Sequence, residues 1–176
     1  MSSAAAQPSF TPEFATTYRA VTLGRIQQEG KTTRRVIGNI PEGKRDYKPE
    51  PNSRSAWDLA SHLVSSDIWF LNGIADRKFE WTGEPAPAAS NIAGLVALHE
   101  AESAKAAARL YALTPAQLLE PVDFFGIMKM PAFLFLQFAQ DHAVHHRGQL
   151  STYLRPMGAK VPDIYGGSFD EPFQGA

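Results

Sequence analysis

The chain contains no cysteine, and this absence excludes disulfide bonds, thiolate metal ligands and a cysteine nucleophile. Any metal ion must therefore be held by nitrogen and oxygen atoms. The sequence also lacks a run of about 18 apolar residues, the length that a membrane-spanning helix needs. Residues 1–8 have neither the basic flank nor the apolar core of a signal peptide. We therefore expect a cytoplasmic protein without a membrane segment.

An excess of charge of either sign is also missing, since 17 lysine and arginine residues balance 18 aspartate and glutamate residues. No block of like charge occurs, so nothing indicates a nucleic-acid footprint. We expect a small-molecule substrate and no nucleic acid. The length of 176 residues suits one domain, which we assign to residues 11–176 after a flexible lead-in at residues 1–10.

Apolar residues at spacings of three and four predict four long helices and one short helix. Capping residues and prolines at the first helical position mark where several of them begin. The predicted helices run from Thr11 to Ile40, from Ser55 to about Gly73, from Ser90 to Leu113, from Thr114 to Glu120 and from Pro131 to about Arg155. The pattern predicts an all-α fold, an antiparallel four-helix bundle with long loops between the helices.

Two segments do not fit a helical pattern. The segment from Val122 to Lys129 could be extended or irregular, and we expect its apolar residues Phe124, Phe125 and Ile127 to pack under the bundle. Beyond Pro156 the density of glycine and proline predicts an irregular C-terminal tail. We expect this tail, with Tyr165, Phe169 and Phe173, to lie back across the bundle.

Three of the five histidines lie between positions 142 and 146. At about 3.6 residues per turn, His142 and His146 share one helix face, whereas His145 points about 60° away from His142. Two histidines at this spacing can ligate one metal ion. The alternative is a pair of buried histidines that carbonyl and carboxylate groups satisfy. The same stripe continues to Gln149 and Tyr153.

A third ligand must come from another helix. His62 lies at the edge of the buried face of the second predicted helix, where a lone histidine is more often a core residue. Four-helix bundles build metal sites from side chains on facing helices, so His62, His142 and His146 together would give three nitrogen ligands and an open position. For His99 we favour a buried residue bonded to a neighbour, with a supporting or fourth-ligand role as the alternative.

Three motifs carry a family resemblance: SAWDLASH at residues 55–62, DHAVHHRGQL at residues 141–150, and LRPMG at residues 154–158 with the downstream Val161-Pro162 and Tyr165. Together they resemble the DinB/YfiT-like family over essentially the whole chain. The resemblance implies a four-helix bundle in which His62, His142 and His146 bind a divalent metal. It also implies that relatives include transferases and isomerases that use low-molecular-weight thiols such as bacillithiol or mycothiol, and that homodimers are common.

The first functional hypothesis is a metal-dependent enzyme, either a thiol-dependent transferase or a hydrolase. Zinc, nickel or iron would accept three imidazoles, and a low-molecular-weight thiol is the expected cosubstrate of a transferase. The candidate catalytic residues are Gln149, Tyr153 and Asp58. The alternatives are a non-catalytic metal-binding or stress-response bundle, which a fourth ligand from His99 would favour, and a bundle whose histidines form a polar network without metal.

Three residues beside the motif have open roles. Asp141 could orient a ligand imidazole, or it could be a solvated residue beside Arg147. For Arg147 itself we expect a surface or interhelical ion pair. His145 lies on the flank of the ligand face in a supporting or structural role.

Overall fold

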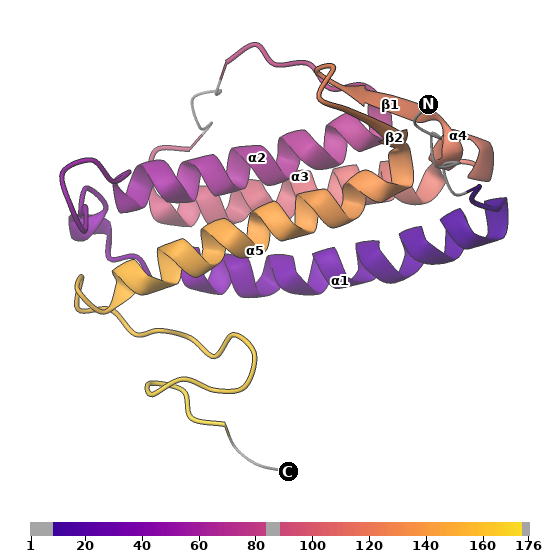
Figure 1. Cartoon of the computed structure of the whole chain (residues 1–176). Helices are drawn as coiled ribbons and strands as arrows, with labels where there is room; N and C mark the ends of the chain where they lie inside the picture. The colour runs from indigo at the N-terminus through magenta and orange to yellow at the C-terminus, as the bar shows by residue number, and fades with distance from the viewer. Residues whose placement is uncertain (1–8, 84–88, 174–176) are drawn as a thin grey trace, which may run out of the picture.

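The computed structural model describes residues 9–83 and 89–173, so the predicted lead-in at residues 1–10 falls almost wholly outside the described residues. Its four long helices are α1 (Pro12–Gly38), α2 (Ala56–Asp76), α3 (Ile92–Ala112) and α5 (Phe135–Leu154), and they lie side by side as a bundle (Figure 1). The predicted four-helix bundle is therefore confirmed. No described helix is long and apolar enough to cross a membrane.

The antiparallel arrangement is wrong for two pairs of neighbouring helices, α2 with α3 and α1 with α5. In Figure 1, α2 and α3 run in the same direction, and α1 and α5 run opposite to them. The chain between Asp76 and Ile92 must therefore return along the length of the bundle. Fifteen residues can span up to about 50 Å, more than the roughly 32 Å of a 21-residue helix. A loop of that length permits either direction, so the sequence pattern could not decide it.

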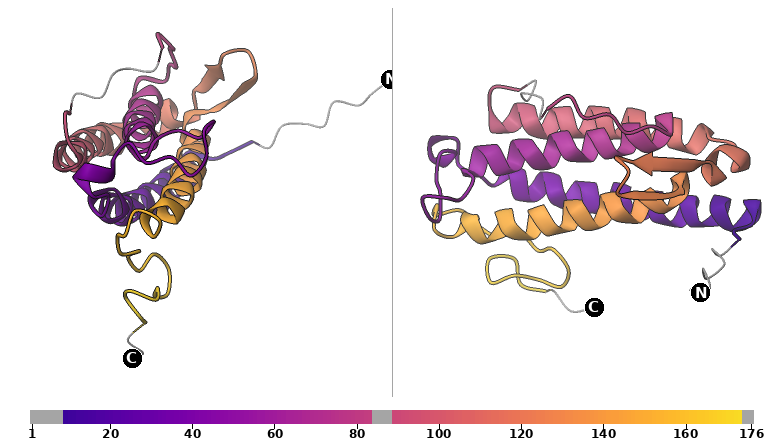
Figure 2. Two further views of the ribbon diagram at one scale, coloured as in Figure 1. Left: turned by 90° about the vertical axis from the view of Figure 1, so that its left-hand side faces the viewer. Right: turned by 45° about the horizontal axis from the view of Figure 1, so that its top comes forward.

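The helices occupy the corners of a square. Helix α2 packs against α3 and α5, and α1 packs against the same two helices, so α1 and α2 lie at opposite corners (Figure 2). As a result, the seam between α2 and α5 and the seam between α1 and α3 are on opposite sides of the bundle.

Side-chain caps start the helices where the sequence predicts them, with two exceptions. Phe14 N donates to Thr11 Oγ1 at 3.2 Å, and Asp58 N donates to Ser55 Oγ at 3.0 Å. The first exception is α3, which begins after Asn91 rather than Ser90, because Gly94 N donates to Asn91 Oδ1 at 2.7 Å. The second is α5, which has no side-chain cap and begins at Phe135 rather than Pro131, because residues 132–134 form a 3-10 turn. Thr114 forms the predicted capping box of the short helix α4 (Pro115–Leu119).

The core consists of two apolar clusters, one at each end of the bundle. The first surrounds Phe133 and Phe135 at the end where α5 begins, and the second surrounds Leu59 and Leu154 at the end where α5 stops. Between the two clusters, the helices α1, α3 and α5 carry buried polar and charged side chains: Glu29, His99, Gln140 and Arg147. The middle of this bundle is therefore polar, which is unusual because buried polar groups need partners.

The segment with no helical pattern forms a small hairpin of β1 (Pro121–Phe124) and β2 (Met128–Pro131), followed by a 3-10 turn, η2 (Ala132–Leu134). A second 3-10 turn, η1 (Glu42–Lys44), lies in the first loop. Phe124 packs against the core as predicted. The prediction is wrong for Phe125 and Ile127, which are 47% and 74% exposed at the hairpin tip. The tight turn directs both side chains outward.

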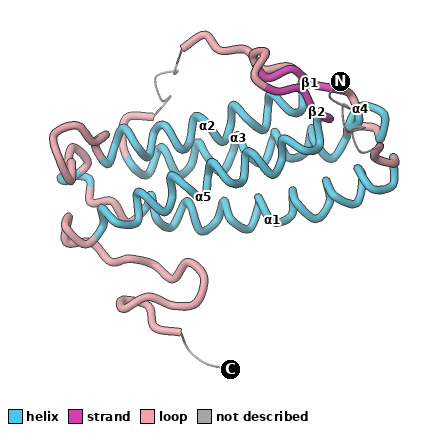
Figure 3. The backbone as a smooth tube through the Cα atoms, in the orientation of Figure 1, coloured by secondary structure: helices cyan, strands magenta, loops and turns pink. Residues whose placement is uncertain are grey.

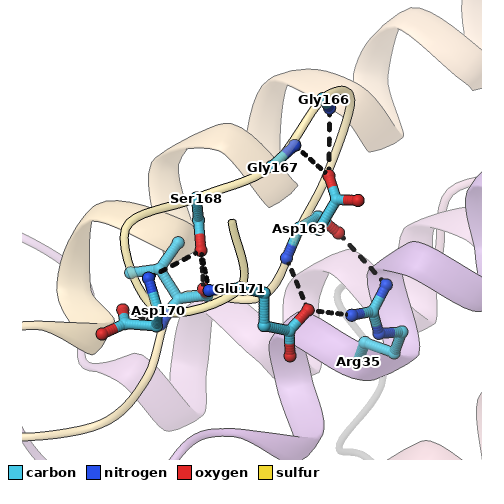
Figure 4. A network of polar contacts seen from close by, with 8 residues as sticks. Arg35, Asp163, Gly166, Gly167, Ser168, Asp170 and Glu171 are labelled. Atoms are coloured by element: carbon cyan, nitrogen blue, oxygen red, sulfur yellow. Dashed lines mark hydrogen bonds and ion pairs between the residues drawn. The ribbon is translucent and has the colours of Figure 1, made fainter. Parts of the chain in front are cut away.

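The tail beyond α5 is irregular, as predicted, but polar contacts attach it to the bundle. Arg35 on α1 donates to the carbonyl oxygen of Asp163 at 3.1 Å and forms an ion pair with Glu171 (Figure 4). The Asp163 carboxylate accepts from the amides of Gly166 and Gly167 and so closes a tight turn. The predicted packing of aromatic residues across the bundle is wrong for Phe169 and Phe173, which are 86% and 69% exposed.

Candidate metal centre

The structure brings together the three histidines that the sequence analysis singled out. His62 reaches the seam between α2 and α5 from one side, and His142 and His146 reach it from the other; the tube in Figure 3 shows the two helices adjacent. Ring centroids are 5.4 Å apart for His62 and His142, 4.7 Å for His62 and His146, and 4.5 Å for His142 and His146. Among the described residues, only these three form such a group.

The spacing of these rings suits a single metal ion. One nitrogen from each ring lies within 4.8 Å of the other two. A point shared by three atoms at that spacing is at most about 2.8 Å from each of them, compared with about 2.0–2.1 Å for a zinc–imidazole bond. Small side-chain rotations therefore bring all three nitrogens into coordination range.

The hydrogen bond of His146 leaves one of its ring nitrogens for a metal. His146 Nδ1 donates to Gln149 Oε1 at 2.9 Å, so its Nε2 carries a lone pair. His62 Nδ1 lies 3.4 Å from Ser66 Oγ. His142 Nδ1 is buried and has no hydrogen-bond partner among the residues described. A buried polar atom without a partner is costly, and a bound metal would remove that cost.

The surroundings of His142 and His146 favour the neutral ring, which is the form that binds metal. Burial lowers the pKa of His142 to about 4, and the neighbouring rings of His146, His62 and His145 add to the effect. Burial also lowers the pKa of His146, with the charge of Arg54 among the smaller causes. At pH 7 both rings can accept a metal ion without first losing a proton.

An aromatic wall continues from the histidines toward the hairpin. The ring of Phe70 lies 5.2 Å from that of His142, and Phe138 lies 5.4 Å from Phe70. The wall consists of Phe70, Phe138, Phe124, Trp69 and Phe125. Phe138 and Phe125 are partly exposed, at 36% and 47%. The histidines are thus bordered by an apolar surface on the side toward the hairpin.

The three candidate catalytic residues lie in different surroundings. Gln149 contacts the ring of His146 directly. Tyr153 is buried, and its hydroxyl donates to the carbonyl oxygen of Arg54 at 3.4 Å. Asp58 is exposed in the first turn of α2. A catalytic role for any of the three stays a prediction, and the contacts favour Gln149 as a residue that orients a ligand.

The solvated position expected as one alternative for Asp141 is confirmed. Asp141 is exposed and accepts from Gln137 Nε2 at 2.7 Å, so it does not orient a ligand imidazole in this structure. Its expected place beside Arg147 is wrong, because Arg147 is buried and forms an ion pair with Glu29. The expected interhelical ion pair of Arg147 is therefore confirmed. His145 is exposed, with its ring 4.8 Å from that of His146.

His99 does not serve as a fourth ligand. It is 2% exposed, its Nε2 lies 3.0 Å from Asp67 Oδ2, and its Nδ1 lies 3.3 Å from Arg34. Both ring nitrogens are thus engaged within the protein. The prediction of a buried histidine bonded to a neighbour is confirmed.

The sequence analysis missed several residues around the three histidines. Ser66 contacts His62 from four positions further along the same helix, and Phe70 contacts His142 across the seam. The spacing of four between His62 and Ser66 is a signal that could have been used. For Phe70 and Arg54 no local signal existed, because their positions depend on how the helices pack.

Comparison with known proteins identifies the family. The model of the DinB family matches residues 14–174. The chain belongs to the DinB family. This assignment confirms the resemblance that the three sequence motifs carry.

Two similar proteins come from Bacillus subtilis. The chain is 31% identical to YjoA of Bacillus subtilis over 132 residues, 72% of this chain and 82% of YjoA. It is 29% identical to YrdA of Bacillus subtilis over 147 residues, 81% of this chain and 85% of YrdA. The crystal structure of the DinB-like protein YjoA superposes with a TM-score of 0.68 at 26% identity, covering 81% of this chain and 96% of that one. A DinB-like protein from Bacillus cereus has the same fold, with a TM-score of 0.70 at 24% identity, covering 82% and 95%.

Proposed function

We propose that this DinB-family protein holds one divalent metal ion with His62, His142 and His146 and uses it in a thiol-dependent transfer reaction. The observation that carries the proposal is the meeting of three imidazole nitrogens within 4.8 Å. The buried Nδ1 of His142, which has no partner in the described part of the chain, supports it. Zinc, nickel and iron would each accept this set of ligands.

A divalent ion with three protein ligands has an open position, where it lowers the pKa of a thiol or water that binds there. The protein supplies the surroundings. Gln149 holds the ring of His146 in place. The aromatic wall beside His142 can pack against an apolar acceptor substrate and keep water from it.

The surroundings favour transfer over the alternatives. Hydrolysis needs a general base beside the reacting water, and the nearby carboxylate of Asp141 is engaged with Gln137. A purely structural metal site is usually closed by a fourth ligand, and His99, which could have supplied one, bonds to Asp67 and Arg34. A homodimer and a cytoplasmic location remain predictions.

The proposal is tested with metal-loaded protein, bacillithiol or mycothiol, and chlorodinitrobenzene as the acceptor. Conjugation joins the thiol sulfur to the aromatic ring and releases chloride and a proton, and absorbance follows the product. We expect turnover by the wild type and by His145→Ala, the matched control on the same helix, and none above background by His62→Ala.

A metal-loaded wild type that neither binds these thiols in a thermal-shift assay nor forms the conjugate would contradict thiol transfer. The metal site is tested separately, by measuring the metal content of the same preparations.

A further inference from the structure

A second pocket enters the bundle on the side opposite the three histidines. Its volume is about 190 Å³, and all four long helices line it. The exposed lining residues Gln27, Lys31 and Glu100 belong to α1 and α3, so the mouth lies at the seam between those helices. Asp67 on α2 and Gln140 on α5 line its inner end. Since the two seams face opposite ways (Figure 2), this pocket does not share an opening with the metal centre.

Small side chains create the space. Each of the four helices except α2 contributes a glycine or alanine to the lining: Gly30, Ala104, Ala107, Ala139 and Ala143. A Cβ atom at Gly30 would lie 3.4 Å from both Arg34 and His99, so even one methyl group would be tight there. The volume exceeds the roughly 150 Å³ of a protein cavity that holds benzene. There is room for a molecule with a short hydrocarbon body.

The inner end of the pocket presents unpaired hydrogen-bond acceptors. Arg34 donates to His99 Nδ1 at 3.3 Å, which leaves the ring proton on Nε2, where it bonds to Asp67 Oδ2 at 3.0 Å. The other carboxylate oxygen, Asp67 Oδ1, is buried and has no partner among the described residues. The same holds for Oε1 of Gln140, a side chain that is only 4% exposed. A carboxylate oxygen can only accept a hydrogen bond, so a ligand of this pocket must carry a hydrogen-bond donor.

We propose that this pocket binds a small organic ammonium ion. The ammonium group would donate to Asp67 Oδ1 and Gln140 Oε1, and its alkyl chain would pack against Leu23, Leu71 and Ala107, which also line the pocket. An ammonium group carries three hydrogen-bond donors and no acceptor. It could therefore donate to both buried oxygen atoms, and its positive charge suits the carboxylate of Asp67.

Charges of both signs lie at the mouth, where Lys31 is exposed to solvent. The guanidinium of Arg34 lies 3.7 Å from the carboxylate of Glu100 and also bonds to His99, so its charge is offset. Buried charged groups are stable when an opposite charge and hydrogen bonds compensate them. At its inner end the pocket is matched to a small cation by its buried acceptors and by its size.

The test uses n-butylammonium as the probe and full-length protein stripped of metal with EDTA, so that an amine cannot bind at the histidines. Isothermal titration calorimetry would measure the affinity, and the methyl NMR signals of Ala107, Ala139 and Ala143 would report where the probe binds. We expect saturable binding with shifts at these methyl groups. Butyrate, which has the same alkyl chain and the opposite charge, should not bind.

Two variants locate the contact. Asp67→Asn keeps an acceptor for His99 but presents an amide to the ligand, and we expect its affinity for n-butylammonium to fall about tenfold or more. Asp141→Asn, an exposed carboxylate outside the pocket, is the matched control and should bind as the wild type does. Circular dichroism verifies that both variants fold.

Two results would overturn the proposal. One is a wild type that shows no saturable binding of n-butylammonium, with only water beside Asp67 in a crystal soaked in the amine. The other is an equal affinity of the protein for n-butylammonium and for butyrate. Since the protein is free of metal throughout, neither result bears on the proposed thiol transfer.

Discussion

Gln149 Oε1 accepts a hydrogen bond from His146 Nδ1 across 2.9 Å, and this contact decides which nitrogen of the ring remains for a metal. Both residues are on α5, three positions apart, so one helix turn fixes their geometry. Metal-binding histidines are usually oriented by a carboxylate, a carbonyl or water. Here a neutral amide has that position, and it adds no negative charge to the site.

Replacing Gln149 with leucine tests this orienting role. Gln149→Leu keeps a side chain of similar size but removes the acceptor, so we expect metal affinity to fall about 10–100-fold. Competition with a chromophoric chelator would measure the affinity. Gln137→Leu is the matched control, since Gln137 is on the same helix and bonds to Asp141 instead. Equal affinities for the two variants would show that Gln149 does not orient the ligand.

The lowered pKa of His142 predicts how the stability of the metal-free protein depends on pH. The ring titrates near pH 6.5 when unfolded and at about 4 when folded. Between these values the unfolded state binds the extra proton, so the free energy of unfolding rises with pH across this window and falls as the pH drops toward 4. Urea denaturation in EDTA at several pH values would measure this dependence of the free energy of unfolding on pH.

The variant His142→Asn isolates that contribution, because other groups also titrate as the pH falls. We expect its free energy of unfolding to depend less steeply on pH than that of the wild type between about pH 4 and 6.5. Identical slopes for the two proteins would mean that His142 is not held neutral by its surroundings.

The buried ion pair of Arg147 and Glu29 predicts a large difference between two arginine substitutions. Arg147 is 2% exposed, and its partner also accepts from the hydroxyl of Tyr165 at 2.8 Å. Arg147→Leu leaves a buried carboxylate without its cation and should cost about 3–5 kcal/mol. Arg25 reaches the same carboxylate at 4.0 Å from an exposed position, so Arg25→Leu should cost at most about 1 kcal/mol. Urea denaturation would measure both variants, and a similar loss of unfolding free energy in Arg147→Leu and Arg25→Leu would contradict this account.

The hairpin tip holds a bulky residue in a conformation that favours glycine. Phe125 has φ of 56°, in the left-handed region, which costs a residue with a Cβ about 1–2 kcal/mol. Phe125→Gly and Phe125→Ala both remove the ring from its place beside Trp69, but only glycine relieves the strain. We expect the glycine variant to be more stable than the alanine variant by about 1 kcal/mol. If Phe125→Ala were as stable as Phe125→Gly or more stable, the backbone at position 125 would not be strained.

Much of the fold followed from local patterns. Proline, threonine and serine at the helix starts are local signals, and α1, α2 and α4 begin where those signals stand. The direction of α3 relative to α2 is not a local property, since the loop between them is long enough for either direction. The hairpin tip was misjudged for a related reason, because its turn geometry turns Phe125 and Ile127 outward despite their apolar side chains.

The candidate metal centre was predictable in part. The spacing of His142 and His146 is a helical signal, but His62, about eighty residues earlier, becomes a partner only once α2 and α5 pack together. Of the polar middle of the bundle, only the buried position of His99 was predicted. The pairing of Arg147 with Glu29 joins residues 118 positions apart, and no periodicity within either helix points to it.

The metal content of three purified proteins tests the central claim most directly. The wild type, His62→Ala and His145→Ala would be prepared without a histidine tag and measured by inductively coupled plasma mass spectrometry. The account predicts about one divalent ion per chain in the wild type and in His145→Ala, because His145 lies outside the group of three, and a loss of most of that metal in His62→Ala. A wild type without a stoichiometric divalent ion, or a His62→Ala variant that keeps its metal, would contradict it.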